Sequence, residues 1–198
     1  MPLRVIAGSA KGRRLKLVPG DTTRPIMDKV KEALFSILGR SLFGATFLDL
    51  YAGTGSVGIE ALSRGANHAI FVERDQHAVR TIQDNLEITG FGEKAIIRRA
   101  DVISFLSRPP QQAGSYDFIY IAPPQYKKLW LDTITALDKN PSWVGEQTRV
   151  IVQIDPGEKS AISLTNLEPY DERVYGKTLL WFFQKKLPMN EQNETTDE

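Results

Sequence analysis

The chain alternates between two patterns of apolar residues. Short runs that are apolar nearly throughout are typical of strands buried on both faces of a sheet. Such runs occupy residues 46–52, 68–74, 94–100, 116–122 and 149–155. Between them, apolar residues recur at helical spacing in residues 55–64, 76–89, 102–106 and 127–138. Strands that alternate with helices in this way predict an α/β fold with a parallel sheet covered by helices on both faces.

The two ends of the chain depart from this alternation. Two short strand-like runs around Gly8 and Gly12 predict an N-terminal β-hairpin. An amphipathic helix follows, with its apolar face expected at Val30, Leu34, Ile37 and Leu38. Near the C-terminus, two strand-like runs within residues 168–186 are joined at Gly176-Lys177. These runs predict an antiparallel hairpin at the edge of the sheet.

Composition sets the domain organisation and the class of protein. With 198 residues, 41% of them hydrophobic, the chain is expected to form one main domain over residues 41–186. Residues 1–40 form a basic extension, and the acidic residues 187–198 are expected to be a disordered tail. The absence of cysteine excludes disulfides and thiolate ligands, and His68 and His77 are too few for a histidine-rich metal centre. Without an apolar run of about 20 residues, the protein is expected to be soluble and cytoplasmic.

The net charge of +1 hides an uneven distribution along the chain. Residues 1–40 carry nine lysines and arginines against three acids. Such a basic segment can neutralise the phosphates of a nucleic acid. The alternative is an ordinary solvated face.

The segment "FLDLYAGTGSVGIE" places three glycines between a predicted strand and a predicted helix. Gly53, Gly55 and Gly58 permit a sharp turn, close approach of a ligand to the backbone, and packing of the helix on the strand. A purely structural turn is the alternative. The order of strand, loop and helix favours a nucleotide-type site.

Acidic residues end the first three predicted strands of the main domain. Glu73 follows the glycines at the distance typical of an acid that binds ribose hydroxyls, which suits both NAD and S-adenosylmethionine. Asp49 favours the latter, because its carboxylate can bind the ammonium of an amino-acid moiety, which NAD lacks. Asp101 is placed to accept a hydrogen bond from an adenine amine. For Glu73 and Asp101, a helix cap or a solvent-facing acid remains the alternative.

Six segments together resemble the RsmD family of bacterial methyltransferases, which methylate the N2 amine of a guanine in 16S ribosomal RNA. They are "TTRPIMDKVKEALFSIL", "FLDLYAGTGSVGIEALSRGA", "FVERD", "NLEITG", "ADVISFL" and "YDFIYIAPPQY". The similarity runs from about Arg4 to Phe183. It implies a Rossmann-like S-adenosylmethionine methyltransferase fold, with a seven-stranded, mostly parallel sheet.

The same resemblance implies roles for individual residues. Those expected to bind the cofactor are Arg24, Pro25, Asp49, Ala52, Gly53, Gly55, Gly58, Glu73, Asp101 and Val102. The basic N-terminal region resembles the family's RNA-contacting extension, which shifts the interpretation of its cations from a solvated face toward RNA contact. The cations concerned are Arg4, Lys11, Arg13, Arg14 and Lys16.

The expected substrate loop departs from the pattern of related amino methyltransferases, which is Asp or Asn, two prolines and an aromatic residue. Here Ala122 stands at the acid or amide position and Gln125 at the aromatic position, with Tyr126 one residue later. Pro123 and Pro124 still stiffen the loop, and the carbonyls of Ala122 and Pro123 remain acceptors for the amine. Gln125 is a candidate substitute acceptor, and Tyr126 a candidate stacking surface for a flipped base.

Three functional hypotheses follow. The first is a monomeric methyltransferase that acts on guanine N2 of 16S ribosomal RNA or of the assembling small subunit. The second, suggested by Ala122, is a methyltransferase-like RNA-binding protein with impaired catalysis. The third, an NAD-dependent oxidoreductase, rests only on the glycine pattern and Glu73, and the chain has no second substrate domain to support it.

Overall fold

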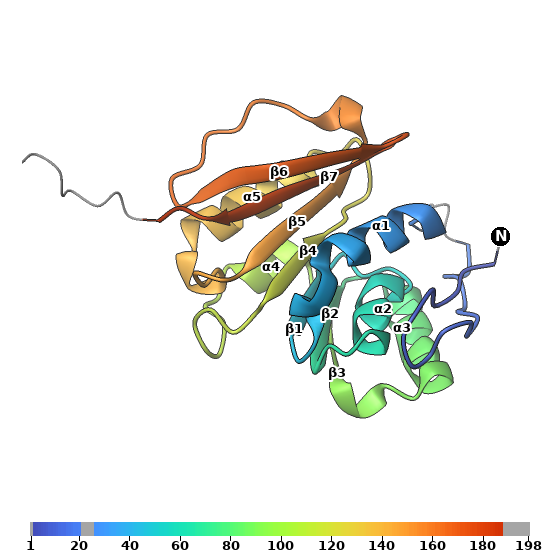
Figure 1. Cartoon of the computed structure of the whole chain (residues 1–198). Coiled ribbons are helices and arrows are strands. Elements are labelled where there is room, and N and C mark those ends of the chain that lie inside the picture. Colours follow the sequence, from blue (N-terminus) through green and yellow to red (C-terminus); the bar gives the residue numbers. More distant parts are fainter. Residues whose placement is uncertain (1, 21–25, 188–198) are drawn as a thin grey trace, which may run out of the picture.

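The computed structural model describes residues 2–20 and 26–187 (Figure 1). The α-helices in these residues are α1 (Asp28–Leu38), α2 (Ser56–Ser63), α3 (Gln76–Thr89), α4 (Val102–Leu106) and α5 (Leu129–Lys139). The strands are β1 (Thr46–Leu50), β2 (His68–Glu73), β3 (Ala95–Arg99), β4 (Phe118–Ile121), β5 (Arg149–Ile154), β6 (Leu167–Tyr175) and β7 (Thr178–Lys185). Short 3₁₀ turns are η1 (Gly39–Leu42), η2 (Gly92–Lys94), η3 (Pro141–Trp143) and η4 (Pro156–Glu158).

All seven strands form one sheet in the order β3-β2-β1-β4-β5-β7-β6. Strands β1 to β5 pair in parallel, whereas β7 pairs antiparallel with both β5 and β6. The predicted fold class is therefore confirmed. The strand order reverses between β1 and β4, and ligands of such sheets bind at the carboxyl ends of the strands beside that reversal.

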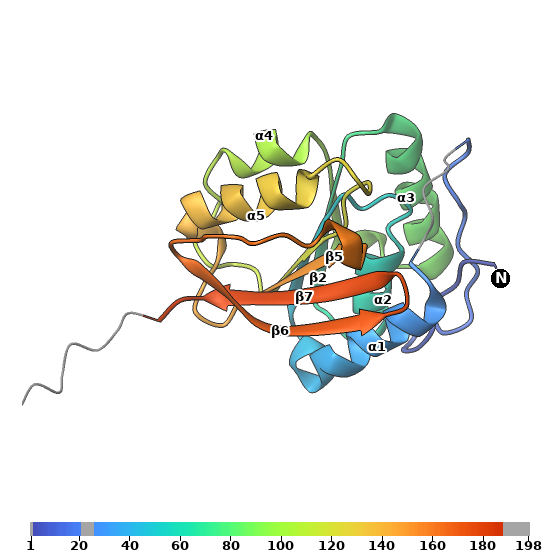
Figure 2. The same cartoon turned by 90° about the horizontal axis from the view of Figure 1, so that it is seen from above.

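Helices cover both faces of the sheet and define two apolar cores. Figure 2 shows α4 and α5 on one side of the sheet and α1 on the other. Because successive side chains of a strand point to opposite faces, Phe47 of β1 packs in the core with α1, α2 and α3, whereas Leu48 packs in the core with α4 and α5. Asp49, the next residue, lies on the same face of β1 as Phe47.

The apolar face of α1 differs from its prediction at one position. Val30, Leu34 and Leu38 are buried as expected, but Ile37 is 36% exposed. Lys31 and Phe35 are buried in its place, which moves the centre of the buried face around the helix and leaves Ile37 at its margin. Phe35 packs on Phe47 of β1, with 6.3 Å between ring centroids.

The N-terminal segment, residues 2–20, forms the predicted β-hairpin in an irregular form. One antiparallel bridge joins Arg4 and Arg14. Backbone N–H groups donate across the hairpin from Leu15 to Leu3 at 2.9 Å, from Val5 to Arg13 at 3.0 Å and from Gly12 to Val5 at 2.9 Å, but these residues form no regular strand. Other backbone groups of the segment bond to the main domain. The backbone N–H groups of Ile6 and Ala7 donate to the Glu60 carboxylate at 2.8 and 3.0 Å. Five apolar side chains of the segment are buried, whereas Leu17 is exposed. The buried ones are Leu3, Val5, Ala10, Leu15 and Val18.

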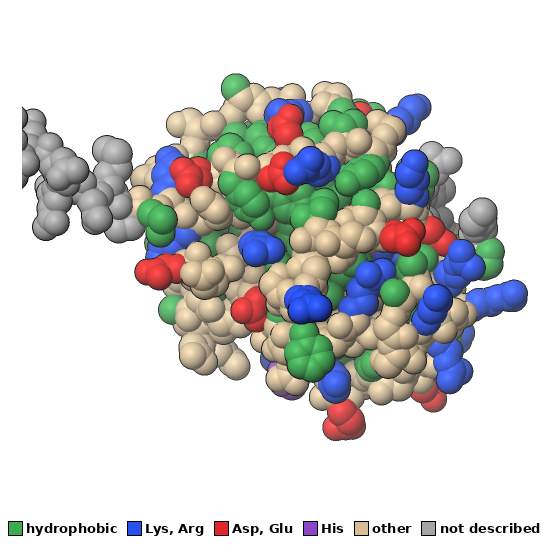
Figure 3. Space-filling model, in the orientation of Figure 1, with side chains coloured by type: hydrophobic (Ala, Val, Ile, Leu, Met, Phe, Trp, Pro, Cys, Tyr) green, Lys and Arg blue, Asp and Glu red, His purple; other side chains and the backbone are tan. Residues whose placement is uncertain are grey.

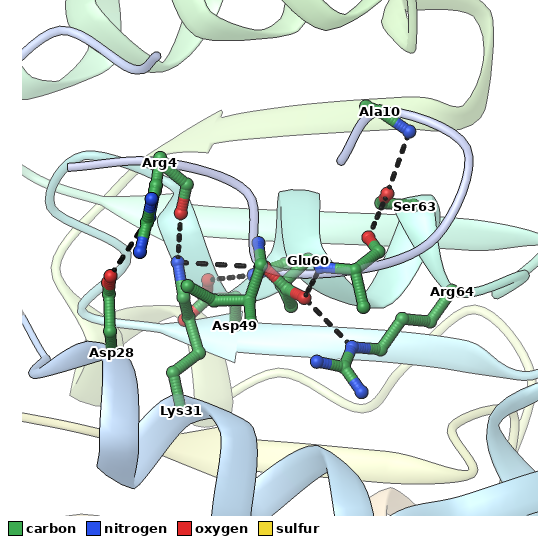
Figure 4. Close-up of polar contacts among 11 residues, drawn as sticks. Arg4, Ala10, Asp28, Lys31, Asp49, Glu60, Ser63 and Arg64 are labelled. Carbon is green, nitrogen blue, oxygen red and sulfur yellow. Dashed lines mark hydrogen bonds and ion pairs between the residues drawn. The ribbon is translucent and has the colours of Figure 1, made fainter. Parts of the chain in front are cut away.

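A buried ion network also holds this segment (Figure 4). Lys31 and Glu60 are both 0% exposed, with 3.6 Å between Lys31 Nζ and Glu60 Oε2. Lys31 Nζ donates to the carbonyl of Arg4 at 2.7 Å, and Arg64 Nε donates to Glu60 Oε1 at 2.8 Å. Burial lowers the pKa of Lys31, although the nearby Glu60 charge acts in the opposite direction. The network thus joins the segment to α1 and α2.

The C-terminal hairpin is confirmed. Strands β6 and β7 pair from Leu167 opposite Lys185 to Tyr175 opposite Thr178, leaving Gly176-Lys177 as a two-residue turn. Gly176 has φ 59°, a conformation that glycine adopts without steric cost in such turns. The hairpin forms the edge of the sheet, with β6 outermost. Of the predicted acidic tail, residues 187–198, only Leu187 lies within the described residues.

Candidate active site

The glycine loop connects the end of β1 to the start of α2. Gly53 and Gly55 have φ values of 55° and 74°, where a side chain would be strained, and the N–H of Gly55 donates to the carbonyl of Ala52 at 2.7 Å. A Cβ atom on Gly58 would lie 2.4 Å from the Phe71 ring. Since Phe71 is fully buried, the close packing of α2 on β2 requires glycine at this position.

Asp49 lies beneath the glycine loop. Its carboxylate is 2% exposed, and Oδ2 accepts a hydrogen bond from the backbone N–H of Gly58 at 3.0 Å. Burial raises the pKa of Asp49 to about 8, partly offset by the hydrogen bond from Gly58. No cation of the described residues forms an ion pair with it, so the carboxylate is mostly protonated at neutral pH.

Glu73, the last residue of β2, connects that strand to the glycine loop. Its Oε2 accepts from the N–H of Gly53 at 2.9 Å, and its Oε1 accepts from the N–H of Asp75 at 2.9 Å. Helix α3 is capped by Asp75, whose side chain accepts from Ala78, so Glu73 is not a helix cap. Each oxygen of a carboxylate has a second lone pair, and both therefore remain able to accept from ribose hydroxyls.

Asp101 follows β3 and is exposed at the same edge of the sheet. Its Oδ1 accepts from the N–H of Ser104 at 3.0 Å, so Asp101 is the N-cap of α4. Asp101 therefore has the role of a helix cap, which was the alternative to binding an adenine amine. Val102 is buried at the start of α4, and Ala52 is buried in the glycine loop. Arg24 and Pro25 lie outside the described residues.

The expected substrate loop starts where β4 ends. Ala122 is half-buried on the face of the sheet that bears Asp49, Pro123 is buried and Pro124 is half-buried. Gln125 is exposed, and the side chain of Tyr126 is 71% exposed. A hydrogen bond to Asp155 and the nearby carboxylates raise the pKa of Tyr126, which keeps its phenol neutral.

Asn85 of α3 is a further residue of this site, which the sequence analysis did not single out. It is 0% exposed, and its side-chain Nδ2 donates to the carbonyls of Thr54 in the glycine loop at 2.9 Å and of Lys16 at 3.1 Å. Its Oδ1 accepts from the N–H of Lys16 at 2.7 Å. Asn85 therefore links the N-terminal segment to the glycine loop. The sequence indicates this residue in one way: Asn85 is an amide at helical spacing from Ala78 and Ile82, on the apolar face of the helix.

The cations of the N-terminal segment divide into two groups. Arg4 and Lys16 form exposed ion pairs with Asp28 and Asp84, at 3.1 and 2.9 Å. Lys11, Arg13 and Arg14 are exposed and form no ion pair with the described residues. Figure 3 shows lysine and arginine side chains gathered on the side of the molecule where this segment lies.

Residues 2–20 and 26–187 contain neither a candidate membrane span nor a candidate metal site. No helix there has the length and apolar character needed to cross a lipid bilayer. No group of three or more histidine, aspartate and glutamate side chains there is arranged to hold a metal ion.

The fold is that of S-adenosylmethionine-dependent methyltransferases, and comparison with known proteins identifies the family. The family model described as "Conserved hypothetical protein 95" matches residues 3–184. The chain belongs to this family, the RsmD family, as the sequence resemblance predicted.

Two relatives match nearly the whole chain. The "Putative rRNA methyltransferase YlbH" of Bacillus subtilis is 35% identical, over 93% of this chain and 100% of that protein. The "Ribosomal RNA small subunit methyltransferase D" of Escherichia coli K12 is 28% identical, over 93% of this chain and 90% of that protein. Membership of this family contradicts the NAD-dependent oxidoreductase hypothesis.

Solved structures agree with this assignment. "Putative methyltransferase yhhF" from Escherichia coli superposes with a TM-score of 0.79 at 29% identity, over 94% of this chain and 99% of that one. An RNA methyltransferase from Salinibacter ruber, in complex with S-adenosyl-L-homocysteine, shares the fold at 14% identity, over 88% of this chain and 100% of that one, with a TM-score of 0.62.

Proposed function

We propose that this protein transfers a methyl group from S-adenosylmethionine to the exocyclic N2 amine of a guanine in small-subunit ribosomal RNA. The observation that supports this most directly is the hydrogen bond that Glu73, at the end of β2, accepts from the backbone N–H of Gly53 in the glycine loop. The arrangement lies at the carboxyl ends of the strands, beside the reversal in strand order. The names of the relatives supply the RNA substrate, and we expect a cytoplasmic monomer.

The residues at the site fit the cofactor by their chemistry. Glu73 retains acceptor capacity for ribose hydroxyls, and Asp101 is exposed where an adenine amine would lie. Asp49 is a buried carboxyl group without a cation among the described residues, and an ammonium group would favour its charged form. The glycines provide close backbone approach, and Ala52 and Val102 provide apolar contact. When bound, the cofactor supplies an electrophilic methyl group on a sulfonium.

The substrate loop has a positioning task. The lone pair of an exocyclic guanine amine is delocalised into the ring, so acceptors must draw the N–H groups out of the base plane and align the nitrogen with the methyl group. We assign this task to the carbonyls of Ala122 and Pro123 and to Gln125, with Tyr126 stacking on the base. The nitrogen would form the new bond to the methyl carbon as the carbon–sulfur bond breaks, with S-adenosylhomocysteine as the leaving group. The amine loses its proton to solvent during or after transfer, so no strong base is needed.

The RNA would be held from the side of the N-terminal segment. Lys11, Arg13 and Arg14 are exposed, and their charges are available to neutralise phosphates. Arg4 and Lys16 belong to the same surface, although each already pairs with an acid. Asn85 and Glu60 fix this segment relative to the glycine loop and α2. The position of the RNA-contacting surface relative to the cofactor site is fixed by the same contacts.

We expect deletion of the gene to remove one N2-methylguanosine from 16S ribosomal RNA, and the purified protein to restore it. Mass-spectrometric mapping of the RNA from the two strains measures the first result, and incubation of the unmodified RNA or small subunits with cofactor measures the second. An unchanged modification map would contradict the proposal. RNA binding without transfer would instead favour the catalytically impaired alternative, which the short side chain of Ala122 supports.

The protonation of Asp49 leads to a prediction about cofactor binding. Its pKa of about 8 leaves the carboxyl group mostly protonated at pH 7. An ammonium group bound beside it lowers that pKa, so binding of S-adenosylhomocysteine at pH 7 should release about one proton per site. Affinity should therefore rise as the pH increases toward 8, where the ligand's own amine starts to lose its charge.

Calorimetry in buffers of different ionisation enthalpy measures this proton release. In Asp49→Asn the release should disappear and the affinity should fall, because a neutral amide cannot pair with the ammonium. Wild-type binding with no proton exchange would refute the assignment of Asp49 to the ammonium group.

A further inference from the structure

The substrate loop adopts a backbone conformation that its own residues disfavour. Tyr126 and Lys128 have φ values of 60° and 56°, in the left-handed region that side chains other than glycine seldom adopt. Such a conformation persists only when surrounding contacts hold it, and it is found preferentially at functional sites. The phenol of Tyr126 is hydrogen-bonded to Asp155, and a separate contact holds its backbone.

Glu158 makes that contact from the neighbouring strand connection. Its Oε2 accepts a hydrogen bond from the backbone N–H of Tyr126 at 2.9 Å. Glu158 ends η4, directly after β5, and β5 pairs with β4, the strand that leads into the substrate loop. The connection after β5 thus contacts the substrate loop through Glu158.

The segment that carries Glu158 is itself firmly held. Asp155 Oδ1 accepts from the N–H of Gly157 at 2.8 Å, and the N–H of Glu158 donates to the carbonyl of Asp155 at 2.9 Å. The next residue, Lys159, forms an ion pair with Glu172 of β6, and its Nζ lies 5.0 Å from the centre of the Trp181 ring on β7. These contacts join the backbone that carries Glu158 to its own turn and to the C-terminal hairpin.

The other carboxylate oxygen of Glu158 does not stabilise the fold. Oε1 is buried and has no hydrogen-bond partner among the described residues. An unpaired buried carboxylate oxygen is unfavourable, so a smaller or apolar residue would suit this position better if packing alone decided it. Among the described residues, the hydrogen bond of this carboxylate is the one to the backbone of the substrate loop.

We propose that Glu158 is a positioning residue for the target base. It holds the backbone of Tyr126 so that the tyrosine ring faces outward and stacks on the base. Tyr126 lies one position later than the aromatic residue of related loops. The ring is 71% exposed, as a stacking surface requires, whereas Gln125 occupies the usual aromatic position. The inference rests on the proposed function, because it assigns the means by which the same site binds its substrate base.

The test uses the full-length protein with the variants Glu158→Ala, Glu158→Gln, Tyr126→Ala and the double variant Glu158→Ala/Tyr126→Ala. Amide hydrogen exchange of the peptide that contains residues 122–130 should accelerate in Glu158→Ala. In Glu158→Gln it should stay slow, because the amide oxygen still accepts from the N–H of Tyr126. The control is Glu146→Ala, an exposed acid before the opposite end of β5, which should leave the exchange unchanged.

Steady-state kinetics supply the functional measurement. Glu158→Ala and Tyr126→Ala should each raise the KM for RNA about tenfold, the size expected from the loss of one stacked base. The double variant should be no worse than Tyr126→Ala alone, since Glu158 acts through that ring. The affinity for S-adenosylhomocysteine and the melting temperature should be unchanged, which a merely structural role would not predict.

The inference would be overturned if amide exchange were unchanged in Glu158→Ala. It would also be overturned if the changes in the KM for RNA of the two single variants added in the double variant. If the wild-type protein transfers no methyl group, the proposed function fails separately. The exchange measurement and the dissociation constants of the same variants for 16S ribosomal RNA then decide the inference, with the same tenfold change and the same non-additivity expected.

Discussion

Glu60→Ala is expected to lower the free energy of unfolding by roughly 3–5 kcal/mol, the usual cost of leaving one partner of a buried ion pair alone. Glu60 accepts from the backbone of Ile6 and Ala7 and from Arg64, and it is the acid beside buried Lys31. Its removal leaves the lysine in an apolar environment and leaves two backbone N–H groups of the N-terminal segment without their acceptor. The melting temperature should fall by about 6–20 °C for a chain of this size.

The pair Lys16 and Asp84 provides the matched control. It also joins the N-terminal segment to the main domain, but both side chains are about half exposed. Asp84→Asn should therefore change the free energy of unfolding by less than about 1 kcal/mol. Equal effects of the two substitutions in thermal or urea unfolding would show that the buried network does not hold the segment as described.

Ala122→Asp is expected to raise the rate of methyl transfer by roughly 10²–10³-fold, the effect usually associated with one acceptor aimed at developing charge. The position follows the last residue of β4, and the Ala122 side chain lies on the face of the sheet that bears Asp49. A carboxylate there would accept from the amine together with the loop carbonyls. Single-turnover transfer to 16S ribosomal RNA measures the rate.

Ala122→Asn should give part of the increase in the rate of methyl transfer. Ala122→Ser, a smaller polar change, should have little effect on that rate. Cofactor affinity should be the same in all three variants, because the substitution concerns the amine and not the cofactor. An active wild type with no gain in Ala122→Asp would show that the carbonyls and Gln125 already suffice. Transfer that appears only in Ala122→Asp would establish the catalytically impaired alternative for the natural sequence.

The central sheet and its helices followed from local patterns. The runs around Phe47, Phe71 and Ile151 are apolar nearly throughout, and each became a strand buried on both faces. Gly176-Lys177 specified the C-terminal turn, and the spacing of Gly53, Gly55 and Gly58 specified the loop between β1 and α2. These features depend on interactions between residues close in sequence, and such interactions are visible in the sequence itself.

The N-terminal hairpin is present in an irregular form, and the local pattern predicted only part of it. The two runs pair through backbone hydrogen bonds from Leu15 to Leu3 and from Val5 to Arg13, as their strand-like pattern predicts. Other backbone N–H groups of the segment, those of Ala7, Ala10 and Lys16, donate to side chains that lie 53 to 69 residues away in sequence: Glu60, Ser63 and Asn85. Only tertiary packing decided these contacts, because no local pattern contains them.

The sequence by itself determined the sheet, the glycine loop and the acids at the ends of the first three strands of the main domain, because apolar periodicity and glycine requirements act over a few residues. Only the tertiary structure decided what each acid touches: Asp49 lies under the loop on Gly58, Glu73 bonds to Gly53, and Asp101 caps α4. It also decided that Glu158 meets Tyr126 across 32 residues of sequence. Such contacts depend on how β4 and β5 align in the folded sheet, and no sequence pattern within either segment encodes that alignment.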